Sequence, residues 1–546
     1  RDFDAVYNGK LFALHLCEDL RIDNEALETV MILLYNYNFD LIPVNVLGNA
    51  YELYIGTIIK EKEGTLKEDE LTLVEDPSVR KKHGIYYTPE YVVDYIVRNT
   101  LGELLKNCKT VDEVSKIKVL DPACGSGSFL IKAFDVIKEW YDNYNKRNQL
   151  AATPNTLDAH FDAVPNVEEK ILTDNLYGVD LDPQAVEITI MNLSLKAVKT
   201  KQKLPHMGDH IVCGNSLISG AAEGLKEYFD APHEKKPLNW SNIFPEVFKQ
   251  GGFDVIIGNP PYVESRDIPN DDWEYFRRNF SSAYKRFDIS VLFIEQAIKL
   301  LKSGGLLGFI TSNKFAVSDY GRGIRAFILN RCSIEQLVDV SNIDVFRDAS
   351  TYPYISIFQS EADASKRTNN NIICVTESTK EDFTSKKLES QIVRQRVFYD
   401  IPNLIFSLYL SDNTYSIIKK IQSGCVKLGD MVWMRDGIHT GNVKEKLIVS
   451  RKITSDCKPM ITAEGINRYN IQWNGLWVNY NQNLIDREAG EYGYLREQWI
   501  FEAKEKLLTA LFGLRPEVAY DEKQFYANNS VKLILPKPNA FSLKYI

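Results

Sequence analysis

The chain has 546 residues, 65 Lys+Arg against 74 Asp+Glu, a net charge of −9 and 44% hydrophobic residues. This length predicts two to four domains, and the apolar fraction excludes a globally disordered chain. No apolar run approaches the roughly 20 residues of a membrane helix, no signal peptide is present, and the eight cysteines lack a CxxC pair. Free thiols in a reducing cytoplasm are therefore expected, without disulfides or a metal site.

The first segment, residues 1–82, is expected to be a helical region with a connector. Apolar residues recur at helical spacing across residues 11–62, for example Leu27, Val30, Met31 and Leu34. Residues 60–82 are rich in Glu and Lys, which is typical of a linker or an exposed turn. The chain begins with Arg1 and not with Met, so we expect the parent protein to extend upstream.

The second segment, residues 83–360, alternates β-branched runs with amphipathic stretches. This alternation predicts a doubly wound α/β domain with a largely parallel sheet, and ligands bind such sheets beyond the carboxyl ends of the strands. The predicted strands are 118–120, 176–179, 210–213, 254–257, 306–311, 336–340 and 354–358, and the predicted helices include 127–140, 183–198 and 288–302.

The remainder of the chain is expected to hold a connector and a further domain. Residues 361–403 are polar and rich in Ser, Thr, Asn and Lys. Residues 404–546 contain short strands, Gly-containing turns and several aromatics, which is typical of a mixed or β-rich domain. The chain ends soon after the apolar run 531–535, so we expect this domain to be incomplete here.

Three motifs carry chemistry, and each follows a predicted strand. In residues 119–130, Asp121 precedes a turn in which Gly125 and Gly127 allow close backbone approach to a ligand; a tight structural turn is the simpler alternative. Asp180 ends the next strand, where it can accept hydrogen bonds from a ribose diol, while Asp182 caps the following helix.

The third motif is Asn259-Pro-Pro-Tyr262, after the strand 254–257. Two prolines remove backbone donors and stiffen the loop. The remaining acceptors, the Asn259 side-chain oxygen and the Pro260 carbonyl, suit a planar NH2 group, with the Tyr262 ring available for stacking. An incidental tyrosine in a rigid loop is the alternative, which the two preceding motifs make improbable.

These motifs, with Gly84-Ile-Tyr-Tyr-Thr-Pro89 before them, resemble the gamma-class N6-adenine DNA methyltransferases (the Eco57I/TaqI-like group), including the type IIG restriction-modification enzymes. The resemblance implies a mixed seven-stranded sheet of the S-adenosylmethionine-dependent, Rossmann-like type and a C-terminal target-recognition domain. It implies double-stranded DNA as substrate and S-adenosylmethionine as cofactor, without a metal. The residues implied to bind the cofactor are Tyr87, Thr88, Pro89, Asp121, Pro122, Ala123, Gly125, Gly127, Asp180, Leu181, Asn215, Ser216, Asn259 and Phe293.

At the reacting base, the resemblance implies roles for Asn259, Pro260, Pro261 and Tyr262, with Phe346 as the second stacking aromatic and Tyr352 or Tyr354 as alternatives. Asn215 stands where the family often has Asp, and its oxygen is expected to accept the hydrogen bond of the cofactor's adenine amino group. DNA contacts are expected from local charge despite the acidic total. The candidates are Arg277, Arg278, Lys285, Arg286, Arg322 and Arg325, and, for base reading, Arg435, His439, Lys444, Arg451 and Arg468.

Three other functions stay open at this point. An Asn-Pro-Pro-Tyr methyltransferase can act on protein glutamine or on RNA, a degenerate methyltransferase fold can serve as a non-catalytic DNA-binding subunit, and a methyltransferase of this family can act in phage defence without a restriction partner. No convincing Pro-Asp…Glu-x-Lys nuclease signature is present, so any endonuclease is expected in an upstream domain.

Overall fold

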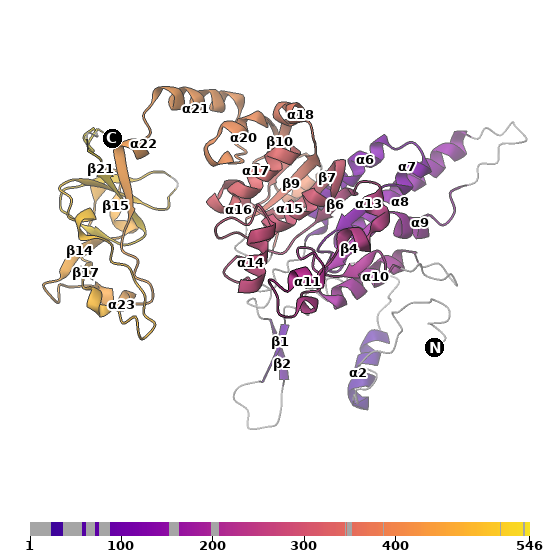
Figure 1. The fold of residues 1–546 in the computed structure, drawn as a ribbon, viewed down its shortest axis with the longest axis horizontal. Coiled ribbons are helices and arrows are strands. Elements are labelled where there is room, and N and C mark those ends of the chain that lie inside the picture. Colours follow the sequence, from indigo (N-terminus) through magenta and orange to yellow (C-terminus); the bar gives the residue numbers. More distant parts are fainter. Residues whose placement is uncertain are drawn as a thin grey trace, which may run out of the picture. The chain divides into compact units, whose positions relative to one another are not determined.

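The computed structural model describes residues 23–35, 57–61, 71–75, 88–151, 163–197, 207–343, 345–346, 352–385, 387–513, 515–538 and 541–545. The chain divides by its internal contacts into two compact units, Arg1–Tyr415 and Ser416–Ile546. Figure 1 shows the first unit as a sheet flanked by helices and the second as a smaller, strand-rich unit.

The first unit is built on a nine-stranded mixed sheet with the order β11-β10-β8-β9-β7-β6-β3-β4-β5. Strands β3 to β7 run parallel, whereas β9 is antiparallel to both of its neighbours, β7 and β8. Strand β3 lies between β4 and β6, so the chain reverses direction across the sheet there, and this is where doubly wound folds bind ligands. The strands are β3 Val119–Asp121, β4 Leu176–Asp180, β5 Ile211–Cys213, β6 Phe253–Gly258, β7 Leu301–Ser312, β8 Cys332–Asp339 and β9 Pro353–Ser360.

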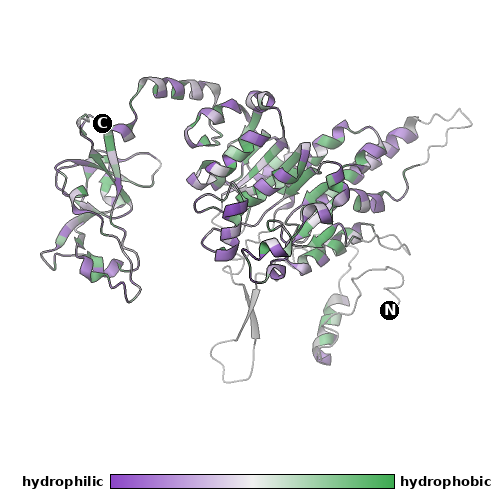
Figure 2. Ribbon diagram, in the orientation of Figure 1, coloured by the Kyte–Doolittle hydropathy of each residue, from purple (hydrophilic) through white to green (hydrophobic). Residues whose placement is uncertain are grey.

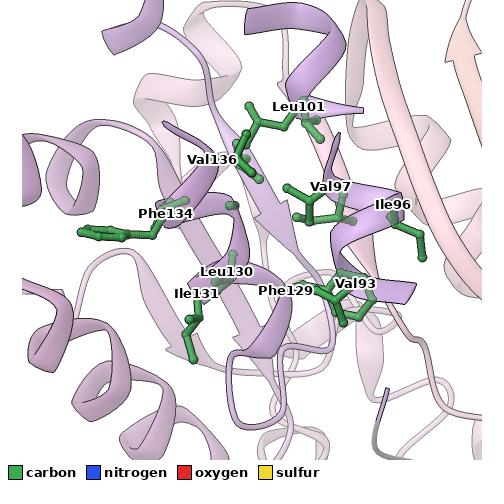
Figure 3. Packing of buried hydrophobic residues seen from close by; sticks show 14 of the residues in the cluster. Val93, Ile96, Val97, Leu101, Phe129, Leu130, Ile131, Phe134 and Val136 are labelled. Atoms are coloured by element: carbon green, nitrogen blue, oxygen red, sulfur yellow. The ribbon is translucent and has the colours of Figure 1, made fainter. Parts of the chain in front are cut away.

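Helices cover both faces of this sheet because its central strands are buried on both sides. Along β3 and β6, Val119, Val255 and Ile257 belong to the core formed with helices α5 and α8, while Leu120 and Ile256 alternate onto the other face. Figure 3 shows the aliphatic side chains of α5 and α8 packed together, and Figure 2 shows hydrophobic strands inside with hydrophilic helix surfaces outside. The helices are α5 Glu90–Asn99, α6 Leu101–Asn107, α8 Ser128–Ala151, α10 Pro183–Ala197, α15 Ser290–Leu300 and α17 Arg322–Arg331.

The sheet has two strands more than the seven that the family resemblance implies. Strands β10 (Asn371–Val375) and β11 (Gln391–Arg394) lie in the segment expected to be a polar connector, and β10 pairs parallel to β8. Their buried positions are few, namely Ile372, Cys374, Val375 and Val393, while Ile373 and Ile392 are exposed. Such short runs within a polar sequence give too little periodicity to be recognised as strands.

The N-terminal segment differs in part from the expected helices. Helix α2 spans Asn24–Tyr35 as expected, but β1 (Thr57–Glu61) and β2 (Leu71–Glu75) form an antiparallel pair. Both strands are rich in Thr, Ile, Val and Leu, and β-branched residues favour strands. The remaining helical positions expected between residues 47 and 54 lie outside the described residues.

The second unit contains two four-stranded sheets and one small hairpin. Its core gathers aliphatic and aromatic side chains from nearly every strand, in line with the β-rich character expected from the sequence. The first sheet has β12 Val432–Asp436, β21 Val531–Pro536, β18 Lys506–Ala510 and β19 Val518–Asp521; the second has β13 Ile448–Val449, β17 Trp477–Asn479, β14 Cys457–Ile461 and β20 Tyr526–Ala527; the hairpin has β15 Ile466–Asn467 and β16 Asn470–Ile471.

The described residues hold neither a membrane-spanning helix nor a metal-binding cluster. None of the helices there combines the length and apolarity needed to cross a bilayer. No group of three or more His, Cys, Asp or Glu residues there is arranged to hold a metal ion.

Candidate active site

A cavity of about 690 Å³ opens at the carboxyl ends of β3, β4, β5 and β6. It lies at the position where the strand order predicts a ligand. Twelve of the residues implied by the resemblance line it: Thr88, Asp121, Pro122, Ala123, Gly125, Asp180, Leu181, Asn215, Ser216, Asn259, Pro261 and Phe293.

The glycine turn after β3 is held by hydrogen bonds from helix α10. Thr189 Oγ1 donates to the Gly125 carbonyl at 2.7 Å, and Asn192 Nδ2 donates to the Ser126 carbonyl at 2.9 Å. Gly125 has φ +52° and no atom within 4 Å of the place of a Cβ, so its backbone faces open space. Gly127, with φ +87°, instead allows close packing, because a Cβ there would stand 3.0 Å from Thr189. Gly127 is therefore a packing position and does not line the cavity.

Two carboxyl groups stand at the strand ends, Asp121 buried and Asp180 half-buried. Asp121 is 1% exposed, and burial, together with the charge of Asp180, raises its pKa to about 8. Burial also raises the pKa of Asp180, although backbone N–H groups of Gly125 and Asp182 donate to its two oxygens at 2.8 and 2.9 Å. Gly258 permits the approach of β6, since a Cβ there would lie 2.7 Å from Asp121 Oδ1. The pair favours a cationic ligand and disfavours a phosphate.

The side chain of Asn215 is oriented differently from expectation. Its Oδ1 accepts the backbone N–H groups of Leu217 and Ile218 at 3.0 and 3.2 Å, in a turn typical of asparagine. The oxygen expected to accept from an adenine amino group is thus already engaged, and the NH2 end is left for a ligand. Ser216 is also engaged, because its hydroxyl donates to the Pro122 carbonyl at 2.6 Å.

The Asn259-Pro-Pro-Tyr262 loop follows β6 directly. The single hydrogen of the Tyr262 hydroxyl is shared between two acceptors, Asn259 Oδ1 at 2.7 Å and the Ile310 carbonyl at 3.0 Å, and the tyrosine is 7% exposed. The Phe346 ring lies 5.9 Å from the Tyr262 ring at 66°. A base stacked between them needs about 7 Å between rings, twice a van der Waals contact. A base that enters this site must therefore move one of the two rings.

The alternative aromatics lie elsewhere. Tyr352 is 58% exposed, and Tyr354 is buried with its ring 6.0 Å from Phe315. Phe293, on α15, lines the cavity, whereas Pro89, Pro260 and Tyr262 do not, and Tyr87 lies outside the described residues.

One wall of the cavity was not predicted from the sequence. The segment after the Asn259-Pro-Pro-Tyr262 loop supplies Asp267, Ile268, Pro269, Asp272 and Phe276, and Lys236 lies at another edge. The sequence gives little indication of this wall. The two acidic residues in the first turn of helix α14 (Asn270–Asn279) are equally typical of the favourable negative charge at the N-terminus of any helix.

Several basic residues expected to face DNA are engaged within the protein. Arg325 is fully buried and donates to the carbonyls of Phe315, Ser318 and Asn403, so it is structural and the expectation was wrong. Arg325 lies on the inward face of helix α17, and its charge alone gives no indication of this position. Arg278 pairs with Glu227 and Glu274, Lys285 pairs with Asp319, and the Arg277 guanidinium lies 4.8 Å from the Trp273 ring. Arg286 and Arg322 are exposed.

The sheet order with β9 antiparallel between β7 and β8, the acidic strand ends and the Asn-Pro-Pro-Tyr loop together define a methyltransferase-type α/β domain. Family comparisons agree with this class. The Eco57I restriction-modification methylase family matches residues 174–346, and the TaqI-like C-terminal specificity domain matches residues 458–546.

Curated relatives are similar over longer stretches. RM.Eco57I of Escherichia coli, a type II restriction enzyme and methyltransferase, is 28% identical over 376 residues, which are 66% of this chain and 36% of the relative. The type II methyltransferase M.BstVI of Geobacillus stearothermophilus is 23% identical over 73% of this chain and 66% of its own length. The chain thus spans about a third of the first relative and just under two thirds of the second.

Among solved structures, the type IIL restriction-modification enzyme MmeI, in complex with DNA, has a TM-score of 0.54 at 12% identity, over 96% of this chain and 78% of MmeI. The DrdV–DNA complex has a TM-score of 0.54 at 15% identity, over 85% of this chain and 51% of DrdV. These likenesses concern the fold. Over the matched residues, the chain is similar to the Eco57I/TaqI-like adenine DNA methyltransferases of restriction-modification systems.

Proposed function

We propose that this chain transfers a methyl group from S-adenosylmethionine to N6 of an adenine flipped out of duplex DNA, within a restriction-modification or related phage-defence system. The observation that carries the proposal is the Asn259-Pro-Pro-Tyr262 loop, which opens beside a cavity lined by Asp121 and Asp180. The relatives named above are a type II restriction enzyme and methyltransferase and a type II methyltransferase, and two neighbours in fold were solved with DNA.

The residues present fit this cofactor. The cavity volume of about 690 Å³ lies within the usual range for small-molecule sites. The open backbone at Gly125, with no atom within 4 Å of a Cβ position, leaves room for close approach, and the carboxyl groups suit a cation. S-adenosylmethionine, when bound, supplies an electrophilic methyl group on a positively charged sulfonium. Asp121, Ala123 and Gly125 would hold its amino acid portion, Asp180 its ribose, and Phe293 its adenine.

The chain's own residues would then activate the base. The N6 lone pair of adenine is delocalised into the ring, so the nitrogen is a poor nucleophile. Acceptance of the two N6–H groups by Asn259 Oδ1 and the Pro260 carbonyl would favour a tetrahedral nitrogen and orient it for in-line attack. Flipping requires a few kcal/mol, which stacking on Tyr262 and Phe346 offsets by about 1–3 kcal/mol per ring. The Tyr262 hydroxyl already donates to Asn259 Oδ1, so N6–H would use the second lone pair of this oxygen or displace the tyrosine hydroxyl.

Cofactor affinity is expected to rise with pH. Asp121 has a pKa raised to about 8, so at neutral pH it is largely protonated in the free protein. The sulfonium carries a permanent positive charge and favours the ionised carboxylate, so the Kd should fall as the pH rises from about 6 to about 8 and level off above. Isothermal titration calorimetry across this range checks the prediction. The Asp121→Asn variant should give a flat profile, and a flat profile in the unaltered chain would refute the role of Asp121.

Replacement of Asn215 by Asp is expected to tighten cofactor binding about tenfold. A carboxylate in the same turn can keep one oxygen for the N–H groups of Leu217 and Ile218 and offer the other to an adenine amino group, which the asparagine NH2 cannot do. Calorimetry with S-adenosylmethionine measures the change. Asn242→Asp, which adds the same charge at an exposed position, is the control. Equal or weaker binding by Asn215→Asp would show that Asn215 does not face the adenine.

Transfer of radiolabelled methyl from S-adenosylmethionine to duplex DNA, RNA and protein, offered separately, tests the function. The proposal expects label in duplex DNA. Label in protein or RNA would favour an Asn-Pro-Pro-Tyr methyltransferase of another substrate class, and no cofactor binding by calorimetry would favour a non-catalytic DNA-binding subunit. Any endonuclease activity of the parent protein is proposed to belong to a domain outside this chain.

A further inference from the structure

The small hairpin of the second unit has an unusual turn. Strands β15 and β16 pair Ile466 with Ile471 and Asn467 with Asn470, which leaves Arg468 and Tyr469 as a two-residue loop. Tyr469 has φ +64°, a left-handed conformation that glycine or asparagine adopts readily and a bulky aromatic rarely does. The strained conformation is held by the Tyr469 N–H, which donates to the Val518 carbonyl at 2.9 Å. Strain of this kind is concentrated at functional sites.

The two side chains of this turn are exposed to solvent and contact each other. Tyr469 is 80% exposed, and Arg468 is also exposed. The Arg468 guanidinium lies 5.1 Å from the Tyr469 ring centre, and its NH2 group donates to the tyrosine hydroxyl at 3.3 Å. Neither side chain belongs to the cores of the unit, so packing does not explain the strained turn.

A second loop presents the same chemistry at the same end of the unit. Residues 511–513 and 515–517 are the described residues between β18 and β19. The final pair of these strands is Thr509 and Val518, and Val518 is the residue bonded to Tyr469. In this loop, Phe512 is 84% exposed and Arg515 is exposed. Glu517 adds one exposed carboxylate to this loop. We call Arg468, Tyr469, Phe512 and Arg515 the hairpin-end patch.

We propose that the hairpin-end patch is a contact surface for duplex DNA, an inference that rests on the proposed function. Two exposed guanidiniums complement a polyanion, and a narrow two-stranded hairpin fits the major groove. The planar fork of Arg468 binds paired acceptors, which DNA offers either as guanine O6 and N7 or as phosphate oxygens. Tyr469 supports the guanidinium from one face, and the two aromatic rings supply contact area without further charge.

Two variants test this contact by fluorescence anisotropy with a short labelled duplex. Arg468→Ala removes the fork, and Tyr469→Gly removes the ring while it relieves the positive φ, so a loss of binding in that variant does not reflect a strained fold. Each should bind duplex about tenfold more weakly than the unaltered chain, with an unchanged melting temperature. Arg487→Ala, which removes an exposed arginine from the loop after Ile485, should bind within about twofold as the matched control.

The salt dependence separates the two kinds of acceptor. A phosphate contact predicts that Arg468→Ala lowers the slope of log affinity against log salt by about one, whereas a guanine contact predicts an unchanged slope and a loss confined to duplexes that carry the chain's own methylation sequence. Duplex binding by both variants equal to that of the unaltered chain overturns the inference. Methyl transfer to DNA by the unaltered chain is measured in parallel, so that the two proposals can fail separately. If the unaltered chain transfers methyl and both variants bind duplex normally, only the hairpin-end patch is refuted. If the variants bind duplex more weakly but the unaltered chain transfers no methyl, only the proposed function is refuted.

Discussion

Replacement of Asn259 by alanine is expected to lower the rate of methyl transfer at least about 100-fold while cofactor affinity changes little. Asn259 Oδ1 is the side-chain acceptor at the end of β6, and the prolines beside it leave the loop few other polar groups. Its oxygen would act on N6 of the base, whereas cofactor binding is distributed over the rest of the cavity lining. Single-turnover transfer to duplex DNA and calorimetry with S-adenosylmethionine measure the two quantities separately.

Asn369→Ala provides the matched control for this experiment. Asn369 is exposed on α18 (Ala364–Asn369), away from the cavity lining, so its loss should change neither quantity. If Asn259→Ala turned over at a rate near that of the unaltered chain, Asn259 would not be the group that activates the amine.

Replacement of Lys506 by methionine is expected to destabilise the second unit by about 3–5 kcal/mol. Lys506 and Asp521 are 0% and 1% exposed, and Lys506 Nζ lies 2.8 Å from Asp521 Oδ2. The Asp521 carboxylate also accepts the backbone N–H groups of Lys523 and Phe525 at 2.8 and 2.9 Å. Removal of the ammonium alone leaves this carboxylate buried without its counter-charge.

Urea unfolding followed by tryptophan fluorescence measures the change, because the second unit holds Trp433, Trp473, Trp477 and Trp499. The double variant Lys506→Met, Asp521→Leu should recover much of the lost stability, since it leaves no unpaired charge. Lys504→Met, at an exposed position two residues away, should unfold at the same urea concentration as the unaltered chain. An unchanged midpoint for Lys506→Met would show that the pair contributes nothing.

The parts of the fold that the sequence predicts are those with strong local signals. Strands β3, β4 and β6 are short apolar runs that end in Asp121, Asp180 and Gly258, and turn chemistry marks where each ends. Strands β10 and β11 were not foreseen, because each is a very short run inside a polar segment. The pairing of β10 with β8 and of β11 with β10 also depends on residues outside each run, which local spacing does not encode.

The site follows the same division. Which residues gather at the cavity was largely foreseeable, since the ends of neighbouring parallel strands meet at one edge of a sheet. The orientation of their side chains was not foreseeable. The Asn215 oxygen accepts hydrogen bonds from the backbone N–H groups of Leu217 and Ile218, and Arg325 points inward and donates to three carbonyls. These outcomes depend on tertiary packing, which residue type and spacing do not encode locally.

Nucleoside mass spectrometry shows directly whether the chain places a methyl group on adenine N6 in duplex DNA. Unmethylated duplex DNA is incubated with the chain and S-adenosylmethionine carrying a deuterated methyl group, and then digested to nucleosides. We expect deuterated N6-methyldeoxyadenosine in the digest, and we expect it to be lost with the Asn259→Ala variant. Deuterated methyl on cytosine, or none on DNA from a chain that binds the cofactor, would contradict the proposed function.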